Sequence, residues 1–261
     1  MIDFKKKKAF FIDLDGTIYF KGKPIPGAIE IIDLLRSQGY ILRFLTNTDS
    51  LTQDGIHKRL LEFGIKNINK EEIFNPPAAL KILFKNKKDV SAYFIVSKKI
   101  REDFKEINTN NNPDYVVLGD PQDYEDLFER LNTAFRYLRS GSNLIALQNS
   151  IFYYDSYGNI NLDTGAFVTL LEKASSKKAI VIGKPNKEFF HPALEELELR
   201  PDEVVVIGDS IETDILGGNN IGASTILLKT GKFTKKTLES STVKPDLILS
   251  DISSLKDYLT F

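Results

Sequence analysis

Short apolar runs along the chain are each followed by a stretch in which apolar residues recur at helical spacing. After the first run, at residues 9–12, apolar residues at helical spacing predict a helix that ends at Gly39; its apolar positions are Ala28, Ile31, Ile32 and Leu35. Strands that alternate with helices are typical of a parallel sheet with helices on both faces. We therefore predict an α/β fold with strands at residues 9–12, 41–45, 179–182, 204–207, 225–228 and 247–249.

A second helix is predicted after the run at 41–45. Ser50 is its expected N-cap and Gly64 its stop signal. Its apolar positions are Ile56, Leu60, Leu61 and Phe63. This stretch extends the strand–helix alternation toward the middle of the chain.

The middle of the chain reads as an inserted domain. Asn75, Pro76 and Pro77 interrupt the pattern, and a second series of strands and helices follows up to about Ser176. We expect strands at 92–96, 115–118, 143–147 and 151–154, a helix at 124–138, and a turn at Tyr157, Gly158 and Asn159 before a strand at 160–162. The predicted domains are a core of residues 1–76 and 177–261 and an inserted α/β domain of residues 77–176.

Composition excludes several classes of protein. The 35 Lys plus Arg and 36 Asp plus Glu give a net charge of −1, which disfavours nucleic acid or an acidic membrane as a partner. Without cysteine, the chain has no disulfide, thiolate metal site or cysteine nucleophile, which favours the cytoplasm. No run approaches the roughly 18 apolar residues of a membrane span, and no export signal is recognised. We interpret the lysines at 5–8 as a solvated charge run rather than a phosphate site.

Polar residues follow four of the predicted strands. In open parallel sheets, ligands bind beyond the carboxyl ends of the strands, so these residues are candidates for a site. The segments are Asp13-Leu14-Asp15-Gly16-Thr17, Thr46-Asn47, Gly183-Lys184-Pro185 and Gly208-Asp209-Ser210, with Asp214 shortly after the last.

These residue types point to phosphate chemistry. Three aspartates at one edge repel one another unless a cation neutralises them, and all-oxygen ligands favour Mg²⁺. Lys184 can supply a positive charge, while Thr46 and Asn47 can donate hydrogen bonds to phosphate. Because cysteine is absent and both histidines lie in predicted helices, an aspartate is the best nucleophile. Asp13 and Asp15 can take different catalytic roles, with one attacking phosphorus and the other transferring protons.

The ordered motifs DLDGT, TN, GKP and GDSIETD resemble those of haloacid dehalogenase (HAD) superfamily phosphatases. The long insertion, together with TNTDS and DTGAFV, is similar to subfamily IIA (NagD-like), near its phospholysine/phosphohistidine/inorganic pyrophosphate phosphatase-like group. The resemblance implies a Rossmann-like core with an inserted cap domain of the C2 type. It further implies a Mg²⁺-dependent phosphatase that acts on a small phosphorylated metabolite, with a homodimer as a possible assembly.

The resemblance also assigns roles residue by residue. It makes Asp13 the nucleophile that forms an aspartyl-phosphate, and Asp15 the general acid and then base. Phosphate would be bound by Thr46, Asn47 and Lys184. The metal would be held by the Asp13 carboxylate, the Asp15 main-chain carbonyl and Asp209, with Asp214 supporting it directly or through water. Residues 17–26 correspond to the family's flap.

Other interpretations stay open. A phosphotransferase or mutase could use the same aspartyl-phosphate, and a catalytically silent metabolite-binding module could keep the fold. A receiver domain is too short at about 120 residues, and no P-loop motif is present. Gln148, Asn149 and Tyr154 could face a substrate, but a structural role is the preferred interpretation. We expect structural roles for His57 and His191 and a solvent-facing Glu212.

Overall fold

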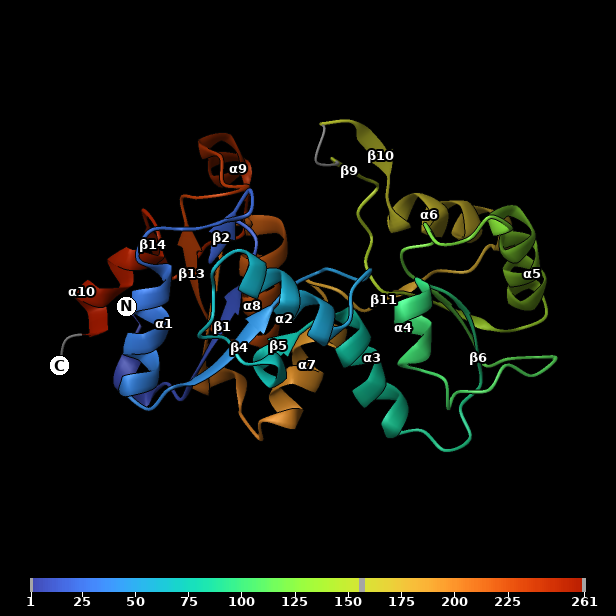
Figure 1. Ribbon diagram of the computed structural model, residues 1–261, viewed down its shortest axis with the longest axis horizontal. Coiled ribbons are helices and arrows are strands. Elements are labelled where there is room, and N and C mark those ends of the chain that lie inside the picture. The colour runs from blue at the N-terminus through green and yellow to red at the C-terminus, as the bar shows by residue number, and fades with distance from the viewer. Residues whose placement is uncertain (1, 155–157, 260–261) are drawn as a thin grey trace. The chain divides into compact units, whose positions relative to one another are not determined.

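The computed structural model describes residues 2–154 and 158–259 of the chain, which divide into two compact units (Figure 1). The first unit consists of Met1–Thr46, Gln53–Phe74 and Lys184–Phe261. The second consists of Asn47–Thr52 and Asn75–Gly183. The second unit thus includes residues 47–52, 75–76 and 177–183, which the division expected from the sequence assigns to the core.

A parallel sheet forms the centre of the first unit, in the strand order β14-β13-β12-β1-β4-β5. Strand β1 (Ala9–Asp13) lies between β12 (Val204–Gly208) and β4 (Ile41–Leu45), and all of its residues are buried. Ile12 pairs with Ile207 and Asp13 with Leu45, so the residues that follow these three strands meet at one edge. The remaining strands are β5 (Ile73–Phe74), β13 (Ser224–Leu228) and β14 (Leu247–Leu249).

Helices and short turns surround this sheet. Helix α7 packs against α8, and its Phe189 ring lies 5.3 Å from the ring of Phe74 at the sheet edge. A short hairpin of β2 (Tyr19–Phe20) and β3 (Lys23–Pro24) lies within the predicted flap. The helices are α1 (Ala28–Ser37), α2 (Gln53–Glu62), α7 (Lys187–Glu196), α8 (Leu216–Ile221), α9 (Lys235–Ser240) and α10 (Lys256–Leu259).

The second unit has its own parallel sheet, in the order β11-β8-β7-β6. Buried residues such as Leu118, Leu138, Leu144 and Leu171 form its core. The strands are β6 (Ala92–Ile95), β7 (Tyr115–Leu118), β8 (Asn143–Ala146) and β11 (Ile180–Val181), and β9 (Phe152–Tyr154) and β10 (Ile160–Leu162) form an antiparallel hairpin. The helices are α3 (Pro76–Lys85), α4 (Lys98–Glu102), α5 (Leu127–Arg139) and α6 (Thr164–Ser175).

Both sheets confirm the predicted α/β fold, but the run at 179–182 was assigned to the wrong sheet. Ile180 and Val181 pair with Ile145 and Ala146 of β8, so β11 is an edge strand of the second unit. An apolar run reveals that a segment is buried, but it does not specify which strand it pairs with. The two-residue strand β5 is too short to give a pattern of its own.

Three helix starts also differ from the sequence analysis. Helix α2 begins at Gln53, so Ser50 is not its N-cap. Asn75, expected to interrupt the pattern, is the N-cap of α3, where its Oδ1 accepts a hydrogen bond from the Ala78 N–H at 3.2 Å. Pro76 fits the first helical position because its missing N–H would have had no partner within the helix. Helix α5 begins at Leu127, three residues after the expected start at 124.

The predicted hairpin in the inserted segment is present. Strand β9 pairs with β10, and Gly158 between them has a positive φ of 85°. Tyr157 of the expected turn, and the side chain of Tyr154, lie outside the described residues.

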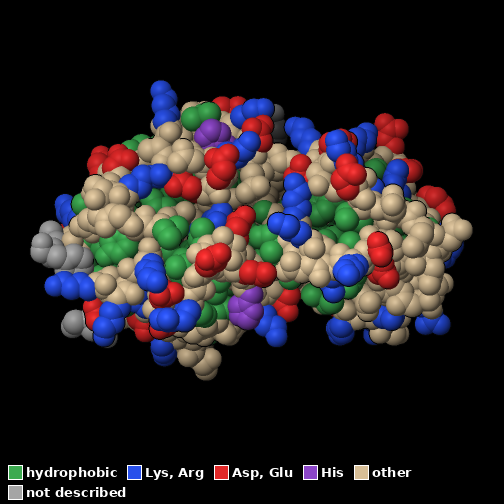
Figure 2. All heavy atoms as spheres, turned by 90° about the horizontal axis from the view of Figure 1, so that it is seen from below, with side chains coloured by type: hydrophobic (Ala, Val, Ile, Leu, Met, Phe, Trp, Pro, Cys, Tyr) green, Lys and Arg blue, Asp and Glu red, His purple; other side chains and the backbone are tan. Residues whose placement is uncertain are grey.

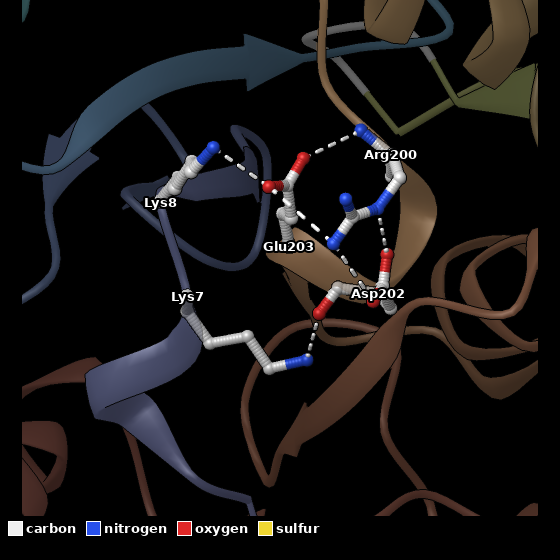
Figure 3. A network of polar contacts seen from close by, with 5 residues as sticks. All are labelled: Lys7, Lys8, Arg200, Asp202 and Glu203. Carbon is white, nitrogen blue, oxygen red and sulfur yellow. Dashed lines mark hydrogen bonds and ion pairs between the residues drawn. The ribbon is translucent and has the colours of Figure 1, made fainter.

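The lysines before β1 contact the loop that leads into β12 (Figure 3). Lys7 Nζ donates to the main-chain carbonyl of Asp202 at 2.7 Å, and Lys8 Nζ lies 2.7 Å from Glu203 Oε1. Arg200 contacts the same two acidic residues. These contacts favour a structural explanation of Lys7 and Lys8.

On the face drawn in Figure 2, acidic and basic side chains are mixed, in keeping with the near-zero net charge. Across residues 2–154 and 158–259, no helix has the length and apolar character needed to cross a membrane.

Candidate active site

Strand β1 delivers Asp13 to the carboxyl edge of the first unit's sheet, and the chain then turns sharply. Gly16 has a φ of 87°, and a Cβ there would overlap the Asp209 carboxylate, so both the turn and the close approach require glycine. Thr17 is fully buried beyond this turn. The local sequence DLDGT therefore places the backbone of Gly16 directly against the Asp209 carboxylate.

Two carboxylates come from the end of β12. Asp209 follows the strand directly, and Asp214 is brought back to it by a π-helical turn at Ile211–Ile215. The Ser210 N–H donates to Asp214 Oδ2 at 3.2 Å, which orients this carboxylate. A Cβ on Gly208 would overlap Asp214, so glycine at the strand end makes room for it. Glu212, on the same turn, is exposed as expected.

Asp13, Asp209 and Asp214 form a buried cluster in which one carboxylate oxygen of each lies within 4.8 Å of the others. Lys184 enters this cluster, with its Nζ 2.6 Å from Asp13 Oδ1 and 2.7 Å from Asp214 Oδ1. The residues are only 8% (Asp13), 2% (Asp209), 1% (Asp214) and 6% (Lys184) exposed. The first unit thus holds three acids and one cation away from water.

The electrostatics of the cluster follow from this burial. Desolvation raises the pKa of Asp13 and Asp209, and the neighbouring Asp214 raises both further, although Lys184 opposes these effects. Burial alone would lower the pKa of Lys184, but its contacts with Asp13 and Asp214 raise it above the usual value. The ammonium is therefore charged, and one cation faces three acidic groups. Such an excess of negative charge favours a further cation.

The donor set fits a hard divalent cation. Asp13 Oδ2 is buried and has no hydrogen-bond partner among the described residues, which is costly unless a ligand satisfies it. The nearby candidate ligands are carboxylate oxygens, the type that Mg²⁺ prefers. The cluster could therefore bind a metal ion.

A loop after β13, which the sequence analysis missed, supports the cluster. The Lys232 N–H donates to Asp209 Oδ2 at 2.5 Å, and Thr230 Oγ1 donates to the Gly16 carbonyl at 2.5 Å. A Cβ on Gly231 would also overlap Asp209, which explains the glycine there. Its position in the sequence could have marked it as part of the site. This loop follows the strand predicted at 225–228, just as each of the four recognised segments follows a predicted strand.

The remaining candidate residues lie outside the carboxylate cluster. Asp15 is exposed, and partial desolvation raises its pKa although Lys232 and Arg59 act in the opposite direction. Thr46 is buried at the end of β4, where its N–H donates to the Phe74 carbonyl at 3.0 Å. Asn47 follows it directly but belongs to the second unit.

The side chains proposed from the cap have structural partners or are exposed. Gln148 is buried, donates to Asp163 Oδ1 at 2.6 Å and accepts from the Ser150 N–H, so it holds a loop. Asn149 is exposed. His57 and His191 lie on α2 and α7, as expected.

Comparison with known proteins identifies the family. The model of the haloacid dehalogenase-like hydrolase family matches residues 10–110, and a HAD-hydrolase-like model matches residues 181–255. Haloacid dehalogenase-like hydrolase domain-containing protein 2 of Rattus norvegicus is 36% identical over 255 residues, which cover 97% of this chain and 95% of the relative. The chain belongs to the haloacid dehalogenase-like hydrolase family.

Other members of the family carry phosphatase names. A phospholysine phosphohistidine inorganic pyrophosphate phosphatase of Xenopus laevis is 30% identical over 260 residues, covering 97% of this chain and 94% of the relative. Among solved structures, the 4-nitrophenylphosphatase of Thermotoga maritima matches with a TM-score of 0.89 and 25% identity, covering 98% of this chain and 99% of that one. These matches and the site chemistry support a phosphatase.

Proposed function

We propose that the protein is a Mg²⁺-dependent phosphatase that hydrolyses a small phosphorylated metabolite through an aspartyl-phosphate on Asp13. The observation that carries this proposal is the buried group of Asp13, Asp209 and Asp214 around Lys184. An uncharged substrate would gain little from such a group. A phosphoryl group that arrives with a divalent cation complements both its acids and its ammonium.

The metal would be held by the carboxylates of Asp13 and Asp209 and by the main-chain carbonyl of Asp15, with Asp214 supporting it directly or through water. When bound, Mg²⁺ would offset the mutual repulsion of the carboxylates and withdraw negative charge from the phosphoryl oxygens. Lys184 would contribute a fixed positive charge to the same phosphoryl group. Thr46 and Asn47 would donate hydrogen bonds to it.

The reaction would proceed in two displacements at phosphorus. An Asp13 carboxylate oxygen forms a bond to phosphorus while the bond to the leaving oxygen breaks, and that oxygen takes a proton from Asp15. A water then gives its proton to Asp15 and attacks phosphorus, and the bond to Asp13 breaks to release phosphate. The exposure of Asp15 suits this role, because it must meet both the leaving group and solvent water.

The aspartyl-phosphate can be tested by rapid quench with p-nitrophenyl phosphate and Mg²⁺, followed by mass spectrometry of the N-terminal peptide. Wild-type protein should carry a transient phosphate on Asp13, Asp13→Asn should carry none, and Asp15→Asn should hold it longer. Asp3→Asn is a matched control, because Asp3 is exposed in the same part of the chain. Phosphate found on Asp15 would overturn the assignment.

The same assay separates the alternatives. Inorganic phosphate should be released in step with p-nitrophenolate. Transfer to an added sugar hydroxyl in place of water would indicate a phosphotransferase or mutase. A protein that binds phosphate with Mg²⁺ but releases none from a panel of phosphorylated metabolites would be a silent binding module.

Metal dependence is tested separately. Excess EDTA should abolish activity, and added Mg²⁺ should restore it. Asp209→Asn should fold but need more Mg²⁺ for half-maximal activity, since a neutral amide is a weaker ligand than a carboxylate. Full activity in EDTA would exclude the metal role. The homodimer implied by the resemblance also stays a proposal, which light scattering after gel filtration would test.

A further inference from the structure

The segment Asn47–Thr52 follows strand β4 of the first unit but belongs to the second. Its Asp49 is 5% exposed and accepts a hydrogen bond from Thr164 Oγ1 at 2.8 Å. Thr164 is fully buried as the first residue of α6. A buried side-chain contact therefore ties this segment to a helix more than a hundred residues later in the chain.

Two further side chains of the second unit hold the segment. Asn75 Nδ2 donates to the Leu51 carbonyl at 2.8 Å, and Ser97 Oγ donates to the Ser50 carbonyl at 3.1 Å. Asn75 and Ser97 are the N-caps of α3 and α4, so both are themselves fixed by helix starts. Residues 49–51 are thus anchored to three helices of one unit.

Asn47 is close to another part of the second unit. A Cβ built on Gly183 would lie 2.9 Å from Asn47 Oδ1, so the Asn47 side chain packs directly on the Gly183 backbone. Gly183 is in turn held by its N–H, which donates to the Leu147 carbonyl at 2.9 Å. Thr46, by contrast, is bonded to Phe74 in the first unit. The two adjacent residues assigned to phosphate binding are therefore held by different units.

We propose that Asp49 and Thr164 are positioning residues that hold Asn47, assigned above to phosphate binding, in place for the substrate phosphoryl group. This inference rests on the proposed function. The contact between Asp49 and Thr164 fixes the backbone two residues after Asn47. The Gly183 backbone limits the positions open to the Asn47 side chain. Together they restrict where the Asn47 donor can point.

The burial of Asp49 supports a functional reason for this contact. Desolvation raises its pKa to about 7, the nearby Asp163 and Asp120 add to the effect, and the hydrogen bond from Thr164 opposes it. An acid buried in this way destabilises the unit near neutral pH. Such groups are concentrated at functional sites.

The test uses Thr164→Val, which removes the hydroxyl and keeps the branched shape, and Thr164→Ser, which keeps the hydroxyl. Thr169→Val is a matched control on the same helix, because Thr169 Oγ1 donates to the Gly165 carbonyl within α6. With full-length protein and Mg²⁺, one measures kcat and KM for p-nitrophenyl phosphate, the inhibition constant of inorganic phosphate, and hydrogen exchange of residues 47–52.

Thr164→Val should speed exchange in residues 47–52 and raise both KM and the phosphate inhibition constant about 5- to 20-fold, with a smaller change in kcat. Thr164→Ser and Thr169→Val should stay within about twofold of wild type. Asp49→Ala should match Thr164→Val, and the double variant should lose no more than the larger single loss, because both remove one contact. Asp49→Ala also provides the test if Thr164→Val does not fold.

A folded Thr164→Val with an unchanged phosphate inhibition constant would overturn the inference while leaving the proposed function intact. The inference would also be overturned if Thr169→Val weakened phosphate affinity as much as Thr164→Val does. A wild-type protein that neither binds phosphate nor hydrolyses p-nitrophenyl phosphate would instead overturn the proposed function, and the inference with it.

Discussion

The buried carboxyl of Asp49 should make the stability of the protein depend on pH, and Asp49→Asn should remove that dependence. Burial raises the pKa of Asp49 from 3.8 to about 7. The folded state therefore keeps the proton at a higher pH than the unfolded state does. Stability from this group is complete below about pH 4, falls as the pH rises to about 7, and is constant above that.

The size of the effect follows from the pKa shift. A difference of about three pKa units corresponds to about 4 kcal/mol between pH 4 and pH 8. Asparagine has the same shape, carries no charge, and can still accept the hydrogen bond from Thr164. The variant should therefore gain stability over wild type as the pH rises, by up to about 4 kcal/mol at pH 8.

Urea unfolding of wild type and variant at pH 4, 5, 6, 7 and 8 measures this difference directly. Titrating groups far from Asp49 cancel in the comparison, whereas the nearby Asp163 and Asp120 add to the effect. Asp54→Asn is a control that should stay nearly flat from pH 4 to pH 8, because its pair with Lys58 lowers the pKa of this exposed carboxyl below its usual value of 3.8. A difference between wild type and Asp49→Asn that stays flat from pH 4 to pH 8 would refute the reasoning.

Three further outcomes are expected in the first unit. Asp15→Asn should lower kcat about 10²- to 10⁴-fold on alkyl phosphates and less on p-nitrophenyl phosphate, whose leaving group departs without a proton; steady-state kinetics with both substrates checks this. Lys184→Met should cost about 3–5 kcal/mol at neutral pH by leaving buried acids unpaired, with part of the loss restored by Mg²⁺ in urea unfolding. Gly16→Ala should cost at least about 1 kcal/mol and weaken Mg²⁺ binding measured by calorimetry, because a Cβ at this positive φ overlaps Asp209.

Much of the candidate site could be predicted from the sequence because its residues directly follow buried strands. Asp13, Thr46 and Asp209 come after apolar runs of strand length, and parallel strands deliver such residues to one edge. The residue types then limit the chemistry, since carboxylates with one lysine and no cysteine suit a divalent cation and phosphate. These inferences need only local patterns and the rule for parallel sheets.

The partners of each segment were decided by the tertiary structure. The run at 179–182 is apolar enough for either sheet, and only its pairing with β8 assigns it to the second unit. Lys184 is the first residue of the final segment of the first unit, yet it lies between Asp13 and Asp214 because the chain returns to the site at that point. Asp214 joins the cluster through a π-helical turn, which no spacing rule predicts.

The contact between Asp49 and Thr164 was also decided by the tertiary structure and not by the local sequence. Asp49 reads locally as a polar residue of a loop, and Thr164 as part of a helix start. Their contact joins residues 115 positions apart, so it forms only when the second unit packs around the segment Asn47–Thr52. Local sequence determines which segments are strands, helices and turns, because backbone and side-chain preferences act over a few residues. Long-range packing determines which of their polar groups meet, because that depends on every buried contact of the unit at once.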